Sequence, residues 1–156
     1  VYMPIKAKAL NKIFYDLRTR YGTVMLPATD LKNRFNEWRN RVHVLALVAD
    51  QNPGNPANAY WLPFFNKPTP FVKGPERYAR EKGCAVVLTY SRIIKRGYYS
   101  MHFEILTPDA SALPEGELTR IYVKRITEII NEQPQNWLWS HRRWKHEWKE
   151  EYGNVI

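Results

Sequence analysis

The sequence predicts an α/β layered domain with a partly parallel sheet and a late hairpin. Two apolar runs, residues 43–49 and 84–90, are rich in Val and Leu and do not alternate with polar residues, which is typical of strands buried on both faces. Segments with helical spacing of apolar residues alternate with these runs, as in layered α/β domains. Ligands bind at the carboxyl ends of strands in such sheets, so Asp50, directly after the first run, is expected near a site.

Two amphipathic helices are expected before the first apolar run. Apolar residues recur at helical spacing over residues 10–21, and Gly22 can end that helix. Residues 23–26 form a candidate strand, and a second helix is expected over residues 29–42. The basic residues on its other faces are interpreted as a solvated helix face or, alternatively, as a phosphate-facing patch; they are Lys32, Arg34, Arg39 and Arg41.

A loop of about twenty residues with five prolines is expected between the two apolar runs. A loop of that length inside a compact domain is usually functional or disordered, and its aromatic residues argue against disorder. Residues 60–72 are apolar and aromatic, with Lys67 as their one charge. Two interpretations are open: this segment could be the wall of a hydrophobic cleft, or it could bury its own aromatic side chains.

The second half of the chain is expected to hold a helix, a hairpin and a long helix. Pro75 suits the first turn of a helix that ends at Gly83. The strand that follows is expected to run to about residue 94 and to pair with residues 98–106, which alternate like a hairpin partner. Residues 118–130 carry a strong amphipathic pattern.

The composition is basic, with a net charge of +9 and a pI of about 9.7. Such a balance favours polyanionic partners: nucleic acid, an anionic membrane face, a phosphorylated substrate or an acidic protein. Cys84 is the single cysteine, so a disulfide within the chain is excluded. The sequence has no Walker loop, no GxGxxG and no Cys/His metal spacing, and we expect neither cofactor nor metal.

The segment 137–148 combines four tryptophans with Arg142, Arg143 and Lys145. It could bind nucleic acid by stacking, or anchor the domain at a lipid headgroup layer, where aromatic and basic residues collect. It could also seal one end of the sheet. His43 and His102 belong to predicted strands and are interpreted as structural.

Several short motifs follow one another in a characteristic order: residues 2–6 (YMPIK), 17–22 (LRTRYG), 49–54 (ADQNPG), 62–66 (LPFFN), 69–71 (TPF) with 74–76 (GPE), 96–99 (RGYY) and 134–145 (PQNWLWSHRRWK). In this order they resemble the lipid A biosynthesis acyltransferases, which are the lauroyl/myristoyl acyltransferase family within the glycerolphosphate acyltransferase-like superfamily. The resemblance covers nearly the whole chain.

The resemblance implies a single partial domain over residues 1–156. Its fold would be a layered α/β/α acyltransferase-like domain with a mostly parallel mixed sheet, incomplete at its N-terminal side. The family transfers a fatty acyl chain from acyl carrier protein to a hydroxyl of a phosphorylated saccharolipid, the lipid A precursor. It does so at the cytoplasmic face of the inner membrane of Gram-negative bacteria. The alternatives are another lipid or aminolipid acceptor, or a basic, Trp-rich module that binds nucleic acid or a membrane surface.

The family's catalytic His-x-x-x-x-Asp/Glu motif is expected before Tyr2, outside this chain. In the resembled mechanism that His is the base on the acceptor hydroxyl, so the chain by itself is expected to be inactive. His146 and Glu151 have the right spacing, but they follow the Trp-rich segment rather than an early strand, and we reject them as catalytic. The start at Val1, inside a basic amphipathic segment, suggests a piece of a longer protein without the family's amino-terminal anchor.

The resemblance also implies a substrate site. The substrate-binding residues would be Arg18, Arg20, Asp50, Gln51, Gly74 and Glu76, and the acyl groove would be lined by Phe64, Phe65, Pro70 and Phe71. The basic charge of the chain suits an acidic carrier protein and an anionic lipid face. An exposed edge of the incomplete sheet could also promote self-association of the chain. From the residues alone, Arg18 and Arg20 could equally flank a helix end, and Asp50 could cap a turn.

Overall fold

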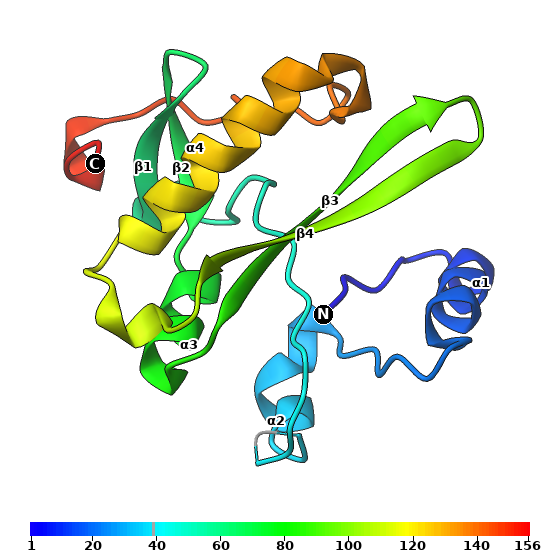
Figure 1. The fold of residues 1–156 in the computed structure, drawn as a ribbon. Coiled ribbons are helices and arrows are strands. Elements are labelled where there is room, and N and C mark those ends of the chain that lie inside the picture. The colour runs from blue at the N-terminus through cyan, green and yellow to red at the C-terminus, as the bar shows by residue number, and fades with distance from the viewer. Residues whose placement is uncertain (39) are drawn as a thin grey trace. The chain divides into compact units, whose positions relative to one another are not determined.

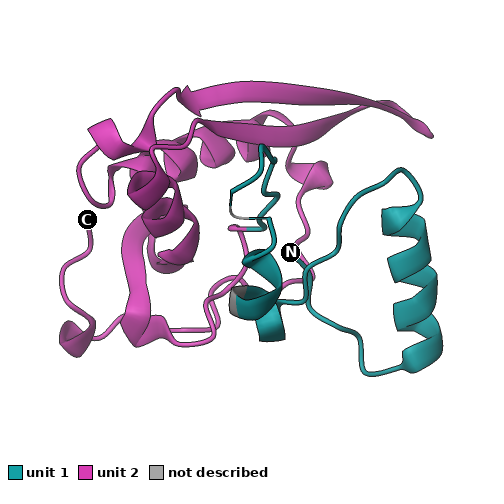
Figure 2. Ribbon diagram, turned by 90° about the horizontal axis from the view of Figure 1, so that it is seen from below, with its two compact units in different colours: residues 1–48 teal, residues 49–156 magenta. Residues whose placement is uncertain are grey.

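A computed structural model describes residues 1–38 and 40–156. Over these residues the chain forms four α-helices and two antiparallel two-stranded sheets (Figure 1). It divides into two compact units, residues 1–48 and 49–156, which are coloured separately in Figure 2.

The predicted layered α/β/α fold with a mostly parallel sheet is wrong. Within the described part of the chain, the only parallel pairings are two isolated bridges, Tyr2 with Pro27 and Trp61 with Val155. The run 43–49, predicted to be a buried strand, forms neither helix nor strand, and Val44 is 97% exposed. The strands instead pair with their neighbours in sequence across tight turns, which requires no crossover connection.

The first unit contains two helices. Helix α1 (Lys8–Thr19) confirms the predicted amphipathic helix, although none of its residues is buried. Helix α2 (Leu31–Phe35) follows a 3₁₀ turn at Ala28–Asp30 and is shorter than predicted. Residues 23–26, all of them described, do not form the candidate strand; the isolated bridge to Tyr2 is made by the next residue, Pro27.

The basic residues of this second helical segment are only partly described. Arg39 lies outside the described residues. Arg34 approaches Asp30 at 3.5 Å between Nε and Oδ2, and the Arg41 guanidinium lies 5.2 Å from the centre of the Trp38 ring.

The proline-rich segment predicted to be a long loop forms no strand over residues 51–58, but its second part is a hairpin. Strand β1 (Ala59–Phe64) pairs with β2 (Lys67–Val72) across a two-residue turn at Phe65 and Asn66, which both have positive φ. Both strands are edges of a two-stranded sheet, where a residue without an N–H can be tolerated. Three of the five prolines that argued for a loop, Pro63, Pro68 and Pro70, are therefore compatible with strands at this position.

The remaining predictions of secondary structure are confirmed. Helix α3 (Gly74–Lys82) ends at Gly83, whose φ of +58° forms a left-handed cap, and α4 spans Glu117–Glu132. Strands β3 (Val86–Lys95) and β4 (Tyr98–Thr107) form the expected hairpin. The run 84–90 is not buried on both faces as predicted, because Val87 and Thr89 of β3 are exposed, whereas β4 alternates as predicted.

The core of the second unit lies where α4 packs against both hairpins. Leu62, Phe64 and Phe71 of the β1–β2 hairpin contact a stripe of α4 residues that includes Val123 and Ile130. Fully burying one such side chain contributes about 1.5–3 kcal/mol. Leu88 of β3 joins the same cluster, so the helix ties the two small sheets into one body.

The C-terminal segment covers the β1–β2 hairpin. Trp144 packs on Phe64, with ring centres 6.0 Å apart, and Tyr152 stacks on Trp61 at 5.6 Å. The Ile156 N–H donates to the Trp61 carbonyl at 2.8 Å. Of the three interpretations of the Trp-rich segment, this arrangement agrees best with sealing one end of a sheet.

Candidate functional site

A cleft of about 790 Å³ opens in the second unit beside helix α3. Its walls come from the turn before β1, from β1 and β2, from α3, and from the loop before α4. The lining residues are Pro53, Gly54, Asn55, Asn58, Tyr60, Val72, Lys73, Gly74, Arg77, Arg80, Glu81, Ser111 and Glu115.

Three cations on and beside α3 line this cleft. Lys73 precedes the helix, and Arg77 and Arg80 follow at positions four and seven residues later, which places all three on one helical face. They outnumber the two carboxylates of the lining, Glu81 and Glu115. The cleft can therefore attract an anion.

The three cationic side chains differ in the contacts that hold them in place. Arg80 Nε donates to the Leu113 carbonyl at 3.0 Å, and Lys73 Nζ lies 4.7 Å from the centre of the Tyr60 ring. Arg77 is mostly exposed and approaches Glu81 only at 3.9 Å. Arg77 and Lys73 are therefore available to a ligand, whereas Arg80 is fixed in place.

Tyr60 supplies a hydroxyl at the wall of the cleft. Its hydroxyl donates to Glu115 Oε1 at 2.9 Å. Burial, together with this carboxylate, raises the pKa of Tyr60 well above its ordinary value of 10. Tyr60 therefore stays protonated at neutral pH and keeps Glu115 at the rim.

The Glu76 side chain, in the first turn of α3, is not part of the lining of the cleft and is buried. Its carboxylate accepts hydrogen bonds from the Gly116 N–H at 2.5 Å, from the Thr119 N–H at 2.9 Å and from the Thr119 hydroxyl. These donors belong to the N-terminal turn of α4, whose N–H groups have no partner within the helix. Glu76 thus joins α3 to the start of α4.

A second polar constellation joins two segments about ninety residues apart in sequence. The buried Arg143 guanidinium donates to Asn52 Oδ1 at 3.0 Å and to the Pro70 carbonyl at 2.8 Å. It lies 4.3 Å from the centre of the Phe71 ring. Burial lowers the pKa of Arg143 to about 10, while Asp50 and Tyr122 act in the opposite direction. Arg143 remains charged at neutral pH and fixes the segment that carries Asp50.

Residues 1–146 match the family model of the bacterial lipid A biosynthesis acyltransferases. The chain belongs to this family. A search of the curated proteins gave no match. Membership makes the protein an acyltransferase by family and confirms the resemblance of the ordered motifs.

The predicted substrate-binding residues of this acyltransferase family member fall in different surroundings. In the first unit, Arg18 and Arg20 are exposed, with guanidinium groups beside the rings of Phe14 and Tyr21, respectively. In the second unit, Gly74 lines the cleft, whereas Gln51 is exposed outside its lining. The role in substrate binding stays a prediction for all six residues.

The four residues predicted to line an acyl groove lie together. Phe64 is 4.7 Å from Phe65 and 5.7 Å from Phe71, measured between ring centres, and Pro70 is buried beside them. Phe64 and Phe71 belong to the hydrophobic core of the second unit, whereas Phe65 is half-buried. Phe64 also contacts the rings of Trp137 and Trp144. Their role in binding an acyl chain stays a prediction.

Two further features bear on membrane and metal chemistry. Among the helices that the structure describes, none combines the length and the apolar character needed to cross a bilayer. The described residues also contain no cluster of three or more His, Cys, Asp or Glu side chains that could hold a metal ion.

The sequence interpretation missed the cations of the cleft and the role of Arg143. The signal for Lys73, Arg77 and Arg80 was present, because basic residues at that spacing share a helical face. No local signal distinguishes Arg143 from Arg142, since its burial depends on contacts with residues 52 and 70.

Proposed function

We propose that this protein binds the phosphorylated saccharolipid acceptor of an acyl transfer reaction, with a phosphate of the acceptor in the cleft beside α3. The acyl chain would come from acyl carrier protein, and the reaction would take place at the cytoplasmic face of the inner membrane. The observation that carries the proposal is the set of three cations on one face of α3, inside a chain of the lipid A acyltransferase family.

The chemistry of the cleft supports a phosphate. Arg and Lys donate charge-assisted hydrogen bonds to phosphate oxygens, and the first turn of α3 adds N–H groups and the positive end of its dipole. Gly74 at that turn leaves open space where a side chain would stand, since no group from elsewhere in the fold lies within 4 Å of that position. An oxyanion can therefore approach the backbone closely at this point.

In the proposed reaction the acceptor hydroxyl attacks the thioester carbonyl of the acyl carrier protein. The new ester C–O bond forms, the C–S bond breaks, and the carrier thiol receives the proton that the base removed from the hydroxyl. The base is the His of the family motif, which the resemblance expects before Tyr2.

The binding of a phosphorylated acceptor tests the proposal. We expect Lys73→Ala with Arg77→Ala to weaken binding of a bisphosphorylated, acylated disaccharide about tenfold, since each removed cation contributes about 0.5–1 kcal/mol at a partly exposed site. The matched control is Lys82→Ala with Lys124→Ala, which removes the same charge from exposed positions outside the cleft. Equal affinity in both double variants would contradict the proposal.

Acyl transfer by the chain itself gives a second test. We expect the purified chain to bind the acceptor but to transfer no acyl group from acyl carrier protein, because the base is assigned to the family motif outside residues 1–156. Product formation is measured by mass spectrometry of the acceptor. Transfer by this chain alone would show that a residue within it acts as the base.

A further inference from the structure

The β3–β4 hairpin has two faces of different character. Leu88, Tyr90, His102 and Glu104 belong to the inner face: Leu88 joins the core, Tyr90 stacks on His102, and Glu104 bonds to Arg125 of α4. The strand register places Val87, Tyr99, Met101, Phe103 and Ile105 on the opposite, outer face. These five large apolar side chains are between 48% and 72% exposed.

The tip of the hairpin is basic and aromatic. Lys95 ends β3, and Arg96 and Gly97 form the turn. The Lys95 ammonium lies 4.4 Å from the centre of the exposed Tyr98 ring. Ile94 beside them is also exposed. The tip therefore combines two cations with amphipathic and apolar side chains.

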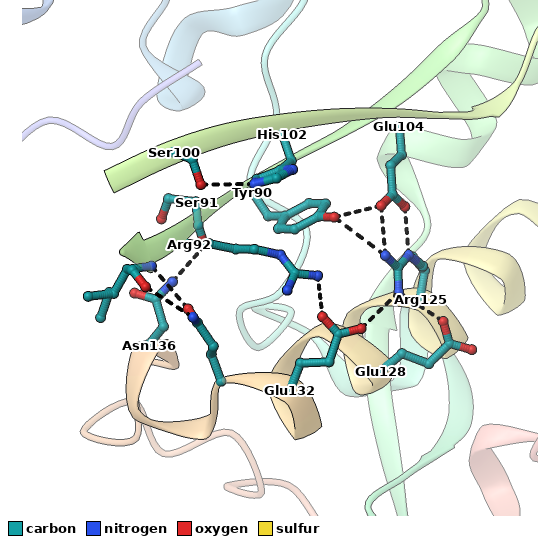
Figure 3. Close-up of polar contacts among 12 residues, drawn as sticks. Tyr90, Ser91, Arg92, Ser100, His102, Glu104, Arg125, Glu128, Glu132 and Asn136 are labelled. Carbon is teal, nitrogen blue, oxygen red and sulfur yellow. Dashed lines mark hydrogen bonds and ion pairs between the residues drawn. The ribbon is translucent and has the colours of Figure 1, made fainter. Parts of the chain in front are cut away.

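The outer face and the tip carry no negative charge. Glu104 is the single acidic residue between positions 86 and 107. Figure 3 shows its carboxylate pointing to Arg125, which donates to both of its oxygens at 2.6 and 2.7 Å, and receiving the Tyr90 hydroxyl. The negative charge of Glu104 is therefore neutralised by Arg125, on the face of the hairpin that packs against α4.

We propose that the outer face and tip of the β3–β4 hairpin dock on the surface of an anionic lipid bilayer. Tyr and exposed aliphatic side chains enter the headgroup layer, and Lys95 and Arg96 meet the lipid phosphates. Charge complementarity selects this occupant, because the charged groups of the docking surface are all cations and they lie beside exposed apolar side chains. The proposal does not rest on the proposed acyl transfer.

The hairpin geometry limits the depth of this contact. Both strands are edges of a two-stranded sheet, so each presents backbone N–H and C=O groups without a neighbouring strand on its outer side. Such groups cannot enter the hydrocarbon layer, where water is absent. The hairpin therefore lies along the interface with its side chains inserted, as amphipathic surface segments do.

A position-specific probe tests the docking. In a Cys84→Ser background, Phe103→Cys on the outer face and Lys124→Cys on exposed α4 are each labelled with an environment-sensitive fluorophore. We expect a blue shift at position 103, and none at 124, with vesicles of phosphatidylglycerol and phosphatidylcholine. Helix α1 also exposes apolar residues, so sedimentation with vesicles would not by itself identify the hairpin.

The charge requirement is tested by Lys95→Gln with Arg96→Gln. Each basic residue near an anionic leaflet contributes about 1 kcal/mol, so we expect the partition coefficient to fall about 25-fold. Lys82→Gln with Lys124→Gln removes the same charge elsewhere and is expected to have a much smaller effect. Two controls separate an anionic bilayer surface from its parts. Vesicles of phosphatidylcholine alone offer a bilayer without net negative charge, and soluble glycerol phosphate offers a free headgroup without a bilayer. Neither is expected to produce the fluorescence shift at position 103.

Several outcomes would overturn the proposal. They are an equal shift at positions 103 and 124, a shift that soluble glycerol phosphate produces, and the same loss of binding in both charge variants. A shift at 103 without vesicles, with a dimer in sedimentation velocity, would show that a second copy covers the face.

Phe103→Ser with Ile105→Ser is expected to weaken binding to the vesicles while leaving the melting temperature of the protein unchanged, because both side chains are exposed.

Discussion

At the scale of single residues, Glu76 of the motif at residues 74–76 has a buried carboxylate that still helps to form the cleft beside α3. Its oxygens accept two backbone N–H groups and one hydroxyl at the start of α4. Gly74 and Arg77, on either side of it, line the cleft. The buried carboxylate therefore anchors the helix that presents the cations.

Replacing Glu76 by Gln tests this positioning role. The amide cannot accept at both positions, so it leaves a buried donor unmatched, which costs about 1–3 kcal/mol. We expect the free energy of unfolding in urea to fall by about that amount, with phosphate affinity of the folded fraction little changed. Unchanged stability with lost phosphate affinity would instead make Glu76 a ligand residue.

Glu104 gives the chain a defined acid sensitivity. The hydrogen bonds from Arg125 and Tyr90 lower the pKa of Glu104 from 4.5 to about 2. A carboxylate with a depressed pKa stabilises the folded state above its unfolded pKa, and the stabilisation is lost as the pH falls through the folded value. We expect stability to fall between pH 4.5 and about 2, and Glu104→Gln to remove part of this dependence, measured by urea midpoints. An unchanged pH profile in Glu104→Gln would contradict the assignment.

At the scale of elements, periodicity predicted the parts of the chain that pack locally. The 3.6-residue pattern identified α1 and α4, while the apolar run after residue 84 and the alternation of residues 98–106 identified the β3–β4 hairpin. The β1–β2 hairpin was missed because its three prolines and Asn66 are typical of loops. The parallel sheet was predicted from the apolar run at 43–49, and no local pattern reveals whether such a run finds a partner strand.

The turn of the β1–β2 hairpin gives a test at this scale. Asn66 has a φ of +60°, which a β-branched residue adopts only with strain. Asn66→Val is expected to lower the free energy of unfolding by about 1–2 kcal/mol, whereas Asn66→Gly should leave it nearly unchanged. Thermal unfolding of both variants checks the expectation. Equal melting temperatures for the two would show that this turn does not constrain the hairpin.

At the scale of the whole molecule, the order of motifs identified the family while the site depends on contacts made by folding. Motif residues 49–54 and 134–145 meet through Asn52 and Arg143, and this contact could not be predicted from spacing. The resemblance singled out Gly74, which lines the cleft. The chain's charge of +9 fits both an acidic carrier and an anionic membrane, but it does not by itself place either one.

The central claim is that the cations beside α3 recognise a phosphate of the acceptor, and a double cycle of binding measurements tests it most directly. The chain and its Lys73→Ala/Arg77→Ala variant are each titrated with the phosphorylated acceptor and with the same molecule after removal of its phosphates. The account predicts that the variant loses about tenfold in affinity for the phosphorylated acceptor and nothing for the dephosphorylated one. An equal loss for both acceptors, or no loss for either, would contradict it.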